Sequence, residues 1–524
     1  MTAGDLRRAW SRVLGPHDDP RPVALLRIGL GLCLLLDVGA LWPLADLLYA
    51  DEGILPRVRA CGELPGRLSL LCHAPDTVVP ALFVAVGIVG LALTLGLATR
   101  IAAVLSTVGF ASLLLRNPVV AAGDQVLWCY LFLLCLSRCG EAWSVDAWWR
   151  ARRPGGRPPR RIPGWPRALM IVQLGVLYGA NGWNKGGRNW DEGNTLAYML
   201  MNDRWFRFEP WWLLSHAEPL LRVGTWVALW FERLFPLVVL AAVARAVLEA
   251  RESDPVRSRA SSPLRSVLQW VLRWPLGPWP WLAMTALLHG TLIVCLNLGW
   301  FVPATLVVGV CLLPRLPWTR PWPETTPSVL GRGARAARVG AAALLVWHTL
   351  AMVQVALPPP ARAATPILAA SLDWWRVHTN TRQTWRMFDR GAPRRARYLR
   401  ACGLDGGGAC APIIIGMGID WHRAPKRPYI GLERGRKVGA RILGSPKWQQ
   451  LFARWLCRST TDPAGRPWAT VVLEREEQPL PDPRWMAEHG PVDPYDRFAD
   501  HRTVRPIVEH ECASADGVAA FPSG

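Results

Sequence analysis

The chain has 524 residues, of which 51% are hydrophobic and only 19% are charged. This composition excludes an intrinsically disordered chain, and it differs from that of an ordinary soluble enzyme, in which about a quarter of the residues are charged. The net charge of +21 would indicate nucleic-acid binding if the cations were clustered. They are instead divided along the chain, with a net +13 in residues 1–357 and a net +8 in residues 358–524.

Apolar runs fill the first two thirds of the chain. A helix that crosses the hydrocarbon core of a bilayer needs about 20 residues, and we expect eight or nine such spans because several of the runs are short. The predicted spans are Pro22–Leu41, Thr77–Leu97, Ile101–Leu115, Gln125–Cys139, Pro166–Trp183, Leu220–Ala242, Pro280–Asn297, Phe301–Leu313 and Gly340–Leu357.

The cations between these runs predict the orientation. With the N-terminus inside, the inner segments hold about 23 Lys and Arg and the outer loops about eight, as the positive-inside rule requires. Because these arginines are spread over separate loops, they argue against a nucleic-acid partner. Nine crossings place the segment after Leu357 outside, whereas one span fewer would leave it in the cytoplasm.

Residues 358–524 are polar and long enough for a small extracytoplasmic domain of mixed α and β structure. Ser445–Cys457 predicts a helix, because Ser445 is a good N-cap, Pro446 suits the first helical position, and apolar residues follow at helical spacing. Ile413–Ile419 and Thr470–Leu473 are expected to be strands. Together with the apolar runs, this predicts an all-α polytopic membrane domain, residues 1–357, followed by a small α+β domain, residues 358–524.

Six cysteines fall in the segments predicted to lie outside. An even number in an oxidising compartment favours disulfides, although the same placement can also arise by chance. The six are Cys61, Cys72, Cys402, Cys410, Cys457 and Cys512.

Lys185, at the end of the fifth predicted span, is the first candidate for chemistry. The sequence has no phosphate-binding loop, nucleophile elbow or metal-ligand spacing, so polar residues within the spans become the main candidates. The chain uses 56 Arg but only 4 Lys, and Lys185 is the one lysine in the membrane half. Since lysine can lose its proton and arginine cannot, Lys185 is a candidate general base. The alternative is a lysine that extends to the membrane surface.

Other polar residues of the spans are weaker candidates. His289 in the seventh span would either assist a base or simply form a hydrogen bond between helices. Asn181 and Asn184 lie beside Lys185 and would line the same cavity or pack against a neighbouring helix. Charged residues in the first span (Arg27, Asp37) and in the sixth (Glu232, Arg233) are interpreted as structural ion pairs or interface charges.

Several stretches, in this order and spacing, resemble the HTTM (horizontally transferred transmembrane) domain family, bacterial relatives of vitamin K-dependent gamma-carboxylase. They are residues 49–57 (YADEGILPR), 143–146 (WSVD), 178–193 (YGANGWNKGGRNWDEG), His289 with Gly299 and Phe301, and 384–388 (TWRMF).

The resemblance implies a site and a cofactor. In the carboxylase, a lysine at the position of Lys185 is the base that deprotonates reduced vitamin K, and a histidine near that site matches His289. The implied cofactor is therefore a reduced quinone of the vitamin K type, with no metal, and a protein or peptide is an implied substrate. The residues expected around the cavity are Tyr178, Asn181, Asn184, Trp190 and Glu192.

The sequence also departs from the carboxylase. Asn184-Lys185 stands where the carboxylase has two lysines, and Gly123-Asp124-Gln125 stands where it has a histidine. Two functions therefore stay open. The first is a quinol-dependent, carboxylase-like lyase or oxidoreductase of the bacterial cytoplasmic membrane. The second is a non-catalytic membrane protein, either a transporter of small hydrophobic molecules or an assembly factor that binds partners.

Overall fold

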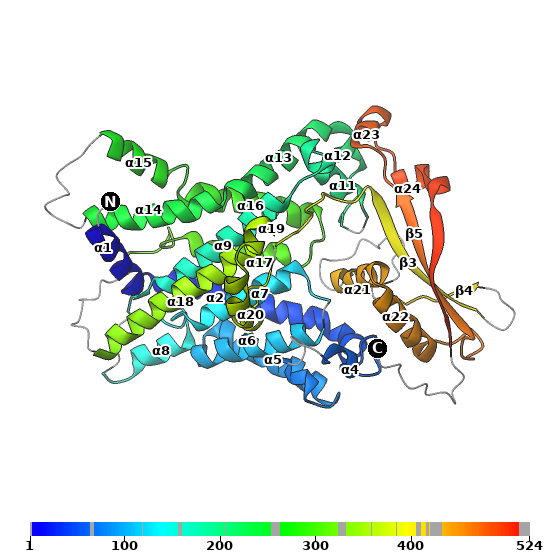
Figure 1. The fold of residues 1–524 in the computed structure, drawn as a ribbon, viewed down its shortest axis with the longest axis horizontal. Coiled ribbons are helices and arrows are strands. Elements are labelled where there is room, and N and C mark those ends of the chain that lie inside the picture. Colours follow the sequence, from blue (N-terminus) through cyan, green and yellow to red (C-terminus); the bar gives the residue numbers. More distant parts are fainter. Residues whose placement is uncertain are drawn as a thin grey trace.

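The computed structural model of the chain is mostly helical, with a small sheet near the C-terminus (Figure 1). It describes residues 3–62, 68–117, 119–155, 160–203, 205–252, 263–322, 332–357, 359–383, 385–404, 410–415, 419 and 432–512.

The first two thirds of the chain form a bundle of helices. These are α1 (Ala3–Leu14), α2 (Pro20–Leu41), α3 (Ala45–Tyr49), α4 (Arg57–Ala60), α5 (Val78–Leu95), α6 (Thr99–Arg116), α7 (Ala122–Cys135), α8 (Val145–Arg152), α9 (Trp165–Asn184), α10 (Arg188–Asp191), α11 (Thr195–Met201), α12 (Trp211–His216), α13 (Glu218–Leu234), α14 (Pro236–Glu252), α15 (Pro263–Arg273), α16 (Pro278–Cys295), α17 (Phe301–Gly309) and α18 (Arg332–Ala356). Three short 3-10 helices, η1 (Trp42–Leu44), η3 (Leu70–Cys72) and η4 (Val310–Leu312), and a two-stranded ladder, β1 (Pro16–Asp18) with β2 (Ile162–Pro163), complete this part.

Each predicted span lies within or largely overlaps helical structure, but fewer helices than predicted are long and apolar enough to cross a bilayer. Within the described residues there are five, or six if the bent pair α13–α14 is counted as one span. The predicted span Leu220–Ala242 is this pair, which bends by 41° between Leu234 and Pro236. In the fourth and eighth predicted spans, α7 has 14 residues and α17 has nine, so the prediction of eight or nine spans is not confirmed.

Helix boundaries follow local chemistry. At the start of α2, the side chain of Asp19 accepts a 3.0 Å hydrogen bond from the backbone N–H of Arg21, and Pro20 occupies the first turn. At the end of α5, Gly96 adopts a left-handed conformation with φ of 71°, which glycine adopts without steric strain.

The C-terminal part combines helices with a four-stranded antiparallel sheet of order β4-β3-β5-β6. In the central pair, Arg395 of β3 lies opposite Pro479 of β5, and Leu404 lies opposite Thr470. The elements of this part are α19 (Pro359–Ala363), α20 (Pro366–Thr379), β3 (Arg395–Leu404), β4 (Cys410–Pro412), α21 (Leu432–Gly444), α22 (Pro446–Ser459), β5 (Thr470–Pro479), α23 (Pro483–His489), α24 (Pro494–Arg497), η5 (Ala499–His501) and β6 (Thr503–Glu511).

One of the two predicted strands is wrong. The helix predicted at Ser445–Cys457 is α22, with Ser445 as its N-cap, and the strand predicted at Thr470–Leu473 is the first half of β5. The strand predicted at Ile413–Ile419 is replaced by β4, which ends at Pro412. Residues 413–415 have no regular structure, and 416–418 lie outside the described residues.

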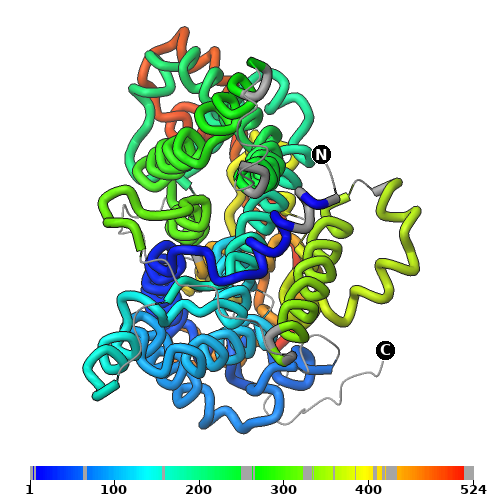
Figure 2. Tube along the Cα trace, turned by 90° about the vertical axis from the view of Figure 1, so that its left-hand side faces the viewer, coloured from blue at the N-terminus to red at the C-terminus, as the bar shows by residue number. Residues whose placement is uncertain are grey.

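The bundle and the sheet share one apolar core. The same cluster of buried side chains contains Leu30 and Leu131 of the bundle and Val438, Phe452 and Val471 of the C-terminal part. Figure 1 shows the sheet at one end of the bundle and α1, α8 and α15 at the other. Figure 2 views the molecule from that other end, where the helices are gathered around α1. The C-terminal part is therefore packed onto the bundle.

Candidate functional site

A cavity of about 990 Å³ lies between helices of the bundle and α21. Its walls are mostly apolar and come from α11, α13, α16 and α21 and from the segment that follows α20. The first two polar residues on the wall are Asn181 and Lys185, at the end of α9. Glu232 of α13 and His289 of α16 add a carboxylate and an imidazole.

Lys185 is buried at the C-terminal end of α9, where it is the C-cap residue. Its Nζ donates a hydrogen bond to Oε2 of Glu232 and lies 4.7 Å from the centre of the Trp190 ring. Asn181 donates a 3.1 Å hydrogen bond from Nδ2 to the same carboxylate oxygen. Lys185 therefore faces a counter-ion inside the protein, and the alternative of a lysine extended to the membrane surface is not what the structure has.

Close packing of α9 against α13 brings the two charges together. A Cβ on Gly182 would lie 2.6 Å from the backbone nitrogen of Arg233 and 2.8 Å from the carbonyl carbon of Glu232. Only glycine allows this approach without displacing one of the helices. One turn earlier, a Cβ on Gly179 would lie 2.6 Å from the Pro236 ring. The face of α9 that contacts α13 and α14 therefore carries glycine at both positions.

The interpretation of the charged residues in the first and sixth spans needs correction. Glu232 is paired with Lys185, whereas Arg233 donates hydrogen bonds to the carbonyl oxygens of Gly182 and Lys185, at 3.1 and 2.9 Å. In the first span, Arg27 donates to carbonyl oxygens, including that of Trp143 at 2.6 Å. Asp37 of the same span is paired with Arg434 of α21.

His289 is buried on α16 and is held at both ring nitrogens. Its Nε2 lies 2.6 Å from the hydroxyl of Tyr178, and its Nδ1 lies 3.3 Å from the hydroxyl of Thr305. Tyr178 comes from α9, two turns before Lys185, and its ring packs against Phe235 with centroids 4.4 Å apart. The imidazole of His289 thus lines the cavity, and the hydroxyls of Tyr178 and Thr305 fix its orientation.

The segment that resembles the TWRMF motif of the family lies against this site. Trp190 is buried and donates a 2.7 Å hydrogen bond from Nε1 to the carbonyl oxygen of Phe388. The backbone N–H of Met387 donates a 2.9 Å hydrogen bond to Oδ1 of Asn181. Met387 and Phe388 also line the cavity, so a segment some 200 residues away in sequence completes its wall.

Three residues expected around the cavity do not line it. Tyr178 contacts the cavity residue His289 through its hydroxyl but is not itself on the wall. Asn184 is half-buried and donates a 2.7 Å hydrogen bond back to the carbonyl oxygen of Ala180. Glu192 is paired with Arg188 and Arg394, and its side chain is 35% exposed. None of the three is among the described residues that line the cavity.

One side of the cavity reaches the outer surface of the bundle between α13 and α16. The lining residues there include Leu220 and Val227 of α13 and Leu287 of α16, which are 68%, 44% and 65% exposed. The cavity wall therefore includes apolar side chains that are exposed on the outer face of the bundle.

The six cysteines expected in disulfides are joined in three pairs: Cys61–Cys72, Cys402–Cys410 and Cys457–Cys512. The first closes the loop before η3, the second joins β3 to β4, and the third joins the end of α22 to the residue after β6.

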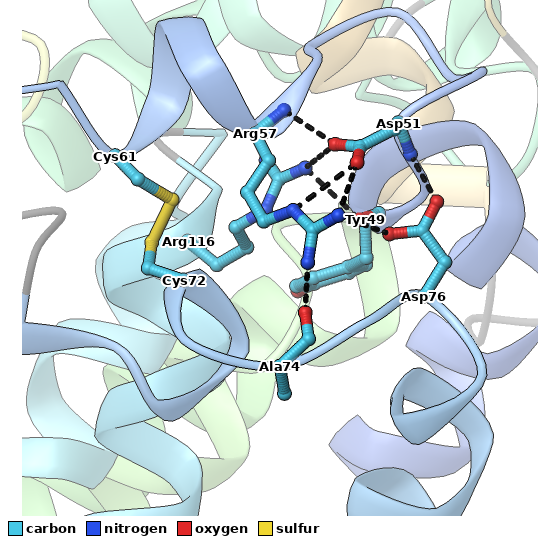
Figure 3. A network of polar contacts seen from close by, with 8 residues as sticks. All are labelled: Tyr49, Asp51, Arg57, Cys61, Cys72, Ala74, Asp76 and Arg116. Carbon is cyan, nitrogen blue, oxygen red and sulfur yellow. Dashed lines mark hydrogen bonds and ion pairs between the residues drawn. A yellow bond between two sulfur atoms is a disulfide. The ribbon is translucent and has the colours of Figure 1, made fainter.

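The loop after α3, which contains the YADEGILPR stretch, forms a separate polar network (Figure 3). Asp51 accepts hydrogen bonds from the backbone N–H of Arg57 at 2.7 Å and from its guanidinium at 2.5 Å, and its own N–H donates to Asp76 at 2.6 Å. Arg116, at the end of α6, donates to the carbonyl oxygen of Tyr49 at 2.9 Å. The network joins this loop to the segment that precedes α5.

The same contacts set the protonation of Asp51. Partial burial by itself raises the pKa of the Asp51 carboxyl. The hydrogen bonds from Arg57 and the charges of Arg57 and Arg116 outweigh burial, so that the pKa lies below its ordinary value. The network is therefore most stable with Asp51 ionised.

The comparisons with known proteins agree with the membrane fold. No solved structure matches the chain at a significant level. The family model of the HTTM domain matches residues 16–250, which run from β1 to α14 and include Lys185 and Glu232. Apolar helices and this domain together indicate a multi-pass membrane protein. Residues 16–250 of the chain are thus similar to the HTTM domain, a membrane domain related to vitamin K-dependent gamma-carboxylase.

Proposed function

We propose that the protein is a membrane enzyme that binds a lipid-soluble quinol in the cavity and removes a proton from it with Lys185 as the base. One observation carries the proposal: the buried pair of Lys185 and Glu232 faces an apolar cavity whose wall includes apolar side chains exposed on the outer face of the bundle.

A buried ion pair contributes little to the free energy of folding, because burying the two charges is costly. Replacing such a pair by apolar side chains of similar size is often neutral or stabilising, so its presence calls for another role. Ionisable residues within a membrane protein are functional candidates for the same reason. Here the pair lies on a cavity wall with His289 nearby on the same wall, which favours a role in proton transfer.

The pair has two ways to hold one proton. In the ionic form the proton is on Lys185, and in the neutral form it is on Glu232. The neutral form leaves a lone pair on the Lys185 amine, which would accept a hydroxyl proton from a bound quinol. Asn181 donates to the carboxylate and holds it in place, and His289 lines the same cavity.

The rest of the cavity suits a substrate with an apolar tail. Leucine, methionine and phenylalanine make up much of the wall, and the opening between α13 and α16 lets a tail remain in the hydrocarbon while the ring reaches Lys185. We assign the reaction to the class of quinol-dependent oxidoreductases or carboxylase-like lyases, with a protein or peptide as the second substrate in the latter case.

The proposed setting is the cytoplasmic membrane of a bacterium, with the N-terminus inside and the C-terminal sheet outside. The arginine asymmetry supports it, as do the three disulfides, all in segments assigned to the outside. In this topology α7, α9 and α17 with η4 act as spans in addition to the longer helices. Labelling of single cysteines in each loop from either side of the membrane tests this arrangement.

Substitution of Lys185 tests the function. Lys185→Arg keeps the positive charge but cannot release a proton, so we expect quinol turnover to fall by at least about 100-fold, the size of general-base effects. Lys447→Arg, on the exposed start of α22, is the matched control and should keep full activity. Full activity of folded Lys185→Arg would refute the assignment of the base.

Two further measurements separate the proposal from its alternatives. Mass spectrometry of lipids co-purified in mild detergent should find a quinone in the wild type. A preparation that instead carries other hydrophobic compounds, or partner proteins without quinone, would favour a transporter or an assembly factor. Transfer of labelled carbon dioxide to a glutamate-containing peptide distinguishes a carboxylase-like lyase from an oxidoreductase.

A further inference from the structure

Helix α21 belongs to the C-terminal part, yet it forms one wall of the cavity. Arg436, Lys437 and Ala440 of this helix line the cavity, opposite side chains that come from the bundle. On this side, the cavity is enclosed only as long as α21 stays on the bundle.

Two residues before this wall, α21 is attached to the bundle by a buried cluster of charges. Arg434 is 2% exposed, and its Nη2 donates hydrogen bonds of 2.6 Å to Oδ1 of Asp37 and 2.5 Å to Oδ1 of Asp124. Its Nη1 donates to Oδ2 of Asp124. Both carboxylates are fully buried, Asp37 on α2 and Asp124 in the first turn of α7. We call these three residues the Arg434 cluster.

The Arg434 cluster adjoins the cavity on both of its sides. On the bundle, Ala122 lines the cavity two residues before Asp124. On α21, Arg436 lines it two residues after Arg434. Asp124 is fixed in position, because its Oδ2 also accepts a 2.7 Å hydrogen bond from the backbone N–H of Ala121. A displacement of Arg434 therefore moves a wall of the cavity.

The contact between Arg434 and the two carboxylates depends strongly on geometry. Arginine can bind two carboxylates at once in a fixed geometry, whereas a lysine presents a single point charge. Apolar side chains at the same three positions would hold α21 without the cost of burying charge. A charged cluster instead gives an attachment with two defined states, engaged or released, because a partly separated buried ion pair is unfavourable.

We propose that α21 is a gate of the cavity and that the Arg434 cluster holds the gate closed. Release of Arg434 from Asp37 and Asp124 lets α21 move away and admits water-soluble molecules to the cavity from the side of the C-terminal part. The opening between α13 and α16 stays the route for lipid-soluble ones. The proposal of a gate rests on the proposed function in one respect, namely that this cavity is the site of the reaction.

Cysteine labelling tests the gate independently of turnover. The reporter is Ala122→Cys on the cavity wall, treated with a charged maleimide and read by mass spectrometry of the labelled peptide. In this background we expect Arg434→Met to raise the labelling rate of Cys at 122 by at least 10-fold. The matched control, Arg441→Met, removes an exposed arginine from the same helix and should leave the rate unchanged.

The outcomes are distinct. Equal rates in folded Arg434→Met and in the parent overturn the gate, and so does an equal increase in Arg441→Met, which would mean general loosening of α21. If Arg434→Met fails to fold, Arg434→Lys and Asp37→Asn take its place, and each should raise the rate by a smaller factor. A quinol-turnover defect in Lys185→Arg with unchanged labelling would support the base and leave the gate intact. An increase in labelling without any quinol turnover in the wild type would support the gate alone.

Discussion

Lys185 and Glu232 are each other's counter-ion, and this predicts that removing one of them costs more stability than removing both. Glu232→Gln leaves the buried Lys185 ammonium facing an amide. Lys185→Met leaves the buried Glu232 carboxylate facing a thioether. The double variant Lys185→Met/Glu232→Gln leaves neither charge in the protein interior.

The cost of each single change has an upper limit, because the remaining group can change its protonation. At pH 7.4, removing the proton from a lysine with an ordinary pKa of about 10.4 costs about 4 kcal/mol. Adding one to a glutamate with an ordinary pKa of about 4.3 costs about the same. Removing one partner of a buried pair costs about 3–5 kcal/mol, and the change of protonation limits this to about 4 kcal/mol, so we expect each single variant to lose about 3–4 kcal/mol. The double variant should lose less than about 1.5 kcal/mol.

Unfolding in mixed micelles with increasing dodecyl sulfate, followed by tryptophan fluorescence, measures these free energies. The exposed pair Arg382 and Asp373, with side chains 51% and 52% exposed, is the control. Its double-variant cycle should show no measurable coupling, because solvent screens such pairs. If instead the losses for Lys185→Met and Glu232→Gln add up in the double variant, the two side chains do not face each other and the site has been assembled wrongly.

Three further changes test other parts of the structure. Gly182→Ala places a Cβ 2.6 Å from the α13 backbone and should cost about 1–3 kcal/mol in the same assay, whereas Gly186→Ala, with no atom within 4 Å of its new Cβ, should be neutral; equal losses would contradict the close approach. The lowered pKa of Asp51 means that its contribution to stability is present above its ordinary value of 3.8 and is lost as the pH falls through the lowered one. Asp51→Asn should therefore flatten the fall in melting temperature between pH 5 and pH 2, and an unchanged profile would show that Asp51 does not carry it. The Cys457–Cys512 disulfide spans 55 residues, so loss of both cysteines should cost up to about 4 kcal/mol in the C-terminal part, measured as a lower melting temperature, and an unchanged melting temperature would refute the pairing.

The helices of the bundle could be predicted from the sequence because apolar runs of about 20 residues have few other structures open to them. The bend at Pro236 and the shortness of α17 could not be predicted. Both depend on what the helices pack against. A run of apolar residues has the same sequence pattern whether the helix is bent or straight. The strand expected at Ile413–Ile419 failed for a related reason, since the tendency of isoleucine to form a strand depends on the surroundings in which it packs.

The site was found in part. The rarity of lysine in this chain singled out Lys185, and His289 was a second candidate because it is a titratable residue within a predicted span. Glu232 was misinterpreted, because an acidic residue followed directly by Arg233 suggests a local pair. Neighbouring residues on a helix point about 100° apart, so they rarely meet, and the spacing itself was a signal against that pair.

Arg434 was not recognised, because it is one of 56 arginines and lies in a segment with the composition of a soluble domain. Of its partners, Asp37 was interpreted as a structural ion pair or interface charge, and Asp124 was noted only as a departure from the carboxylase. Buried acids in apolar helices require a cation, and in the first span Arg27 was the nearest one in sequence. The true partner is 397 residues beyond Asp37.

That separation has a consequence for how the protein is made. The ribosome delivers Asp37 and Asp124 to the membrane long before it synthesises residue 434, so the growing bundle holds two acids without their cation for most of translation. The bundle is completed only when the last part of the chain returns to it. A nascent chain arrested ahead of α21 would therefore lack the contacts that Arg434 makes with both acids.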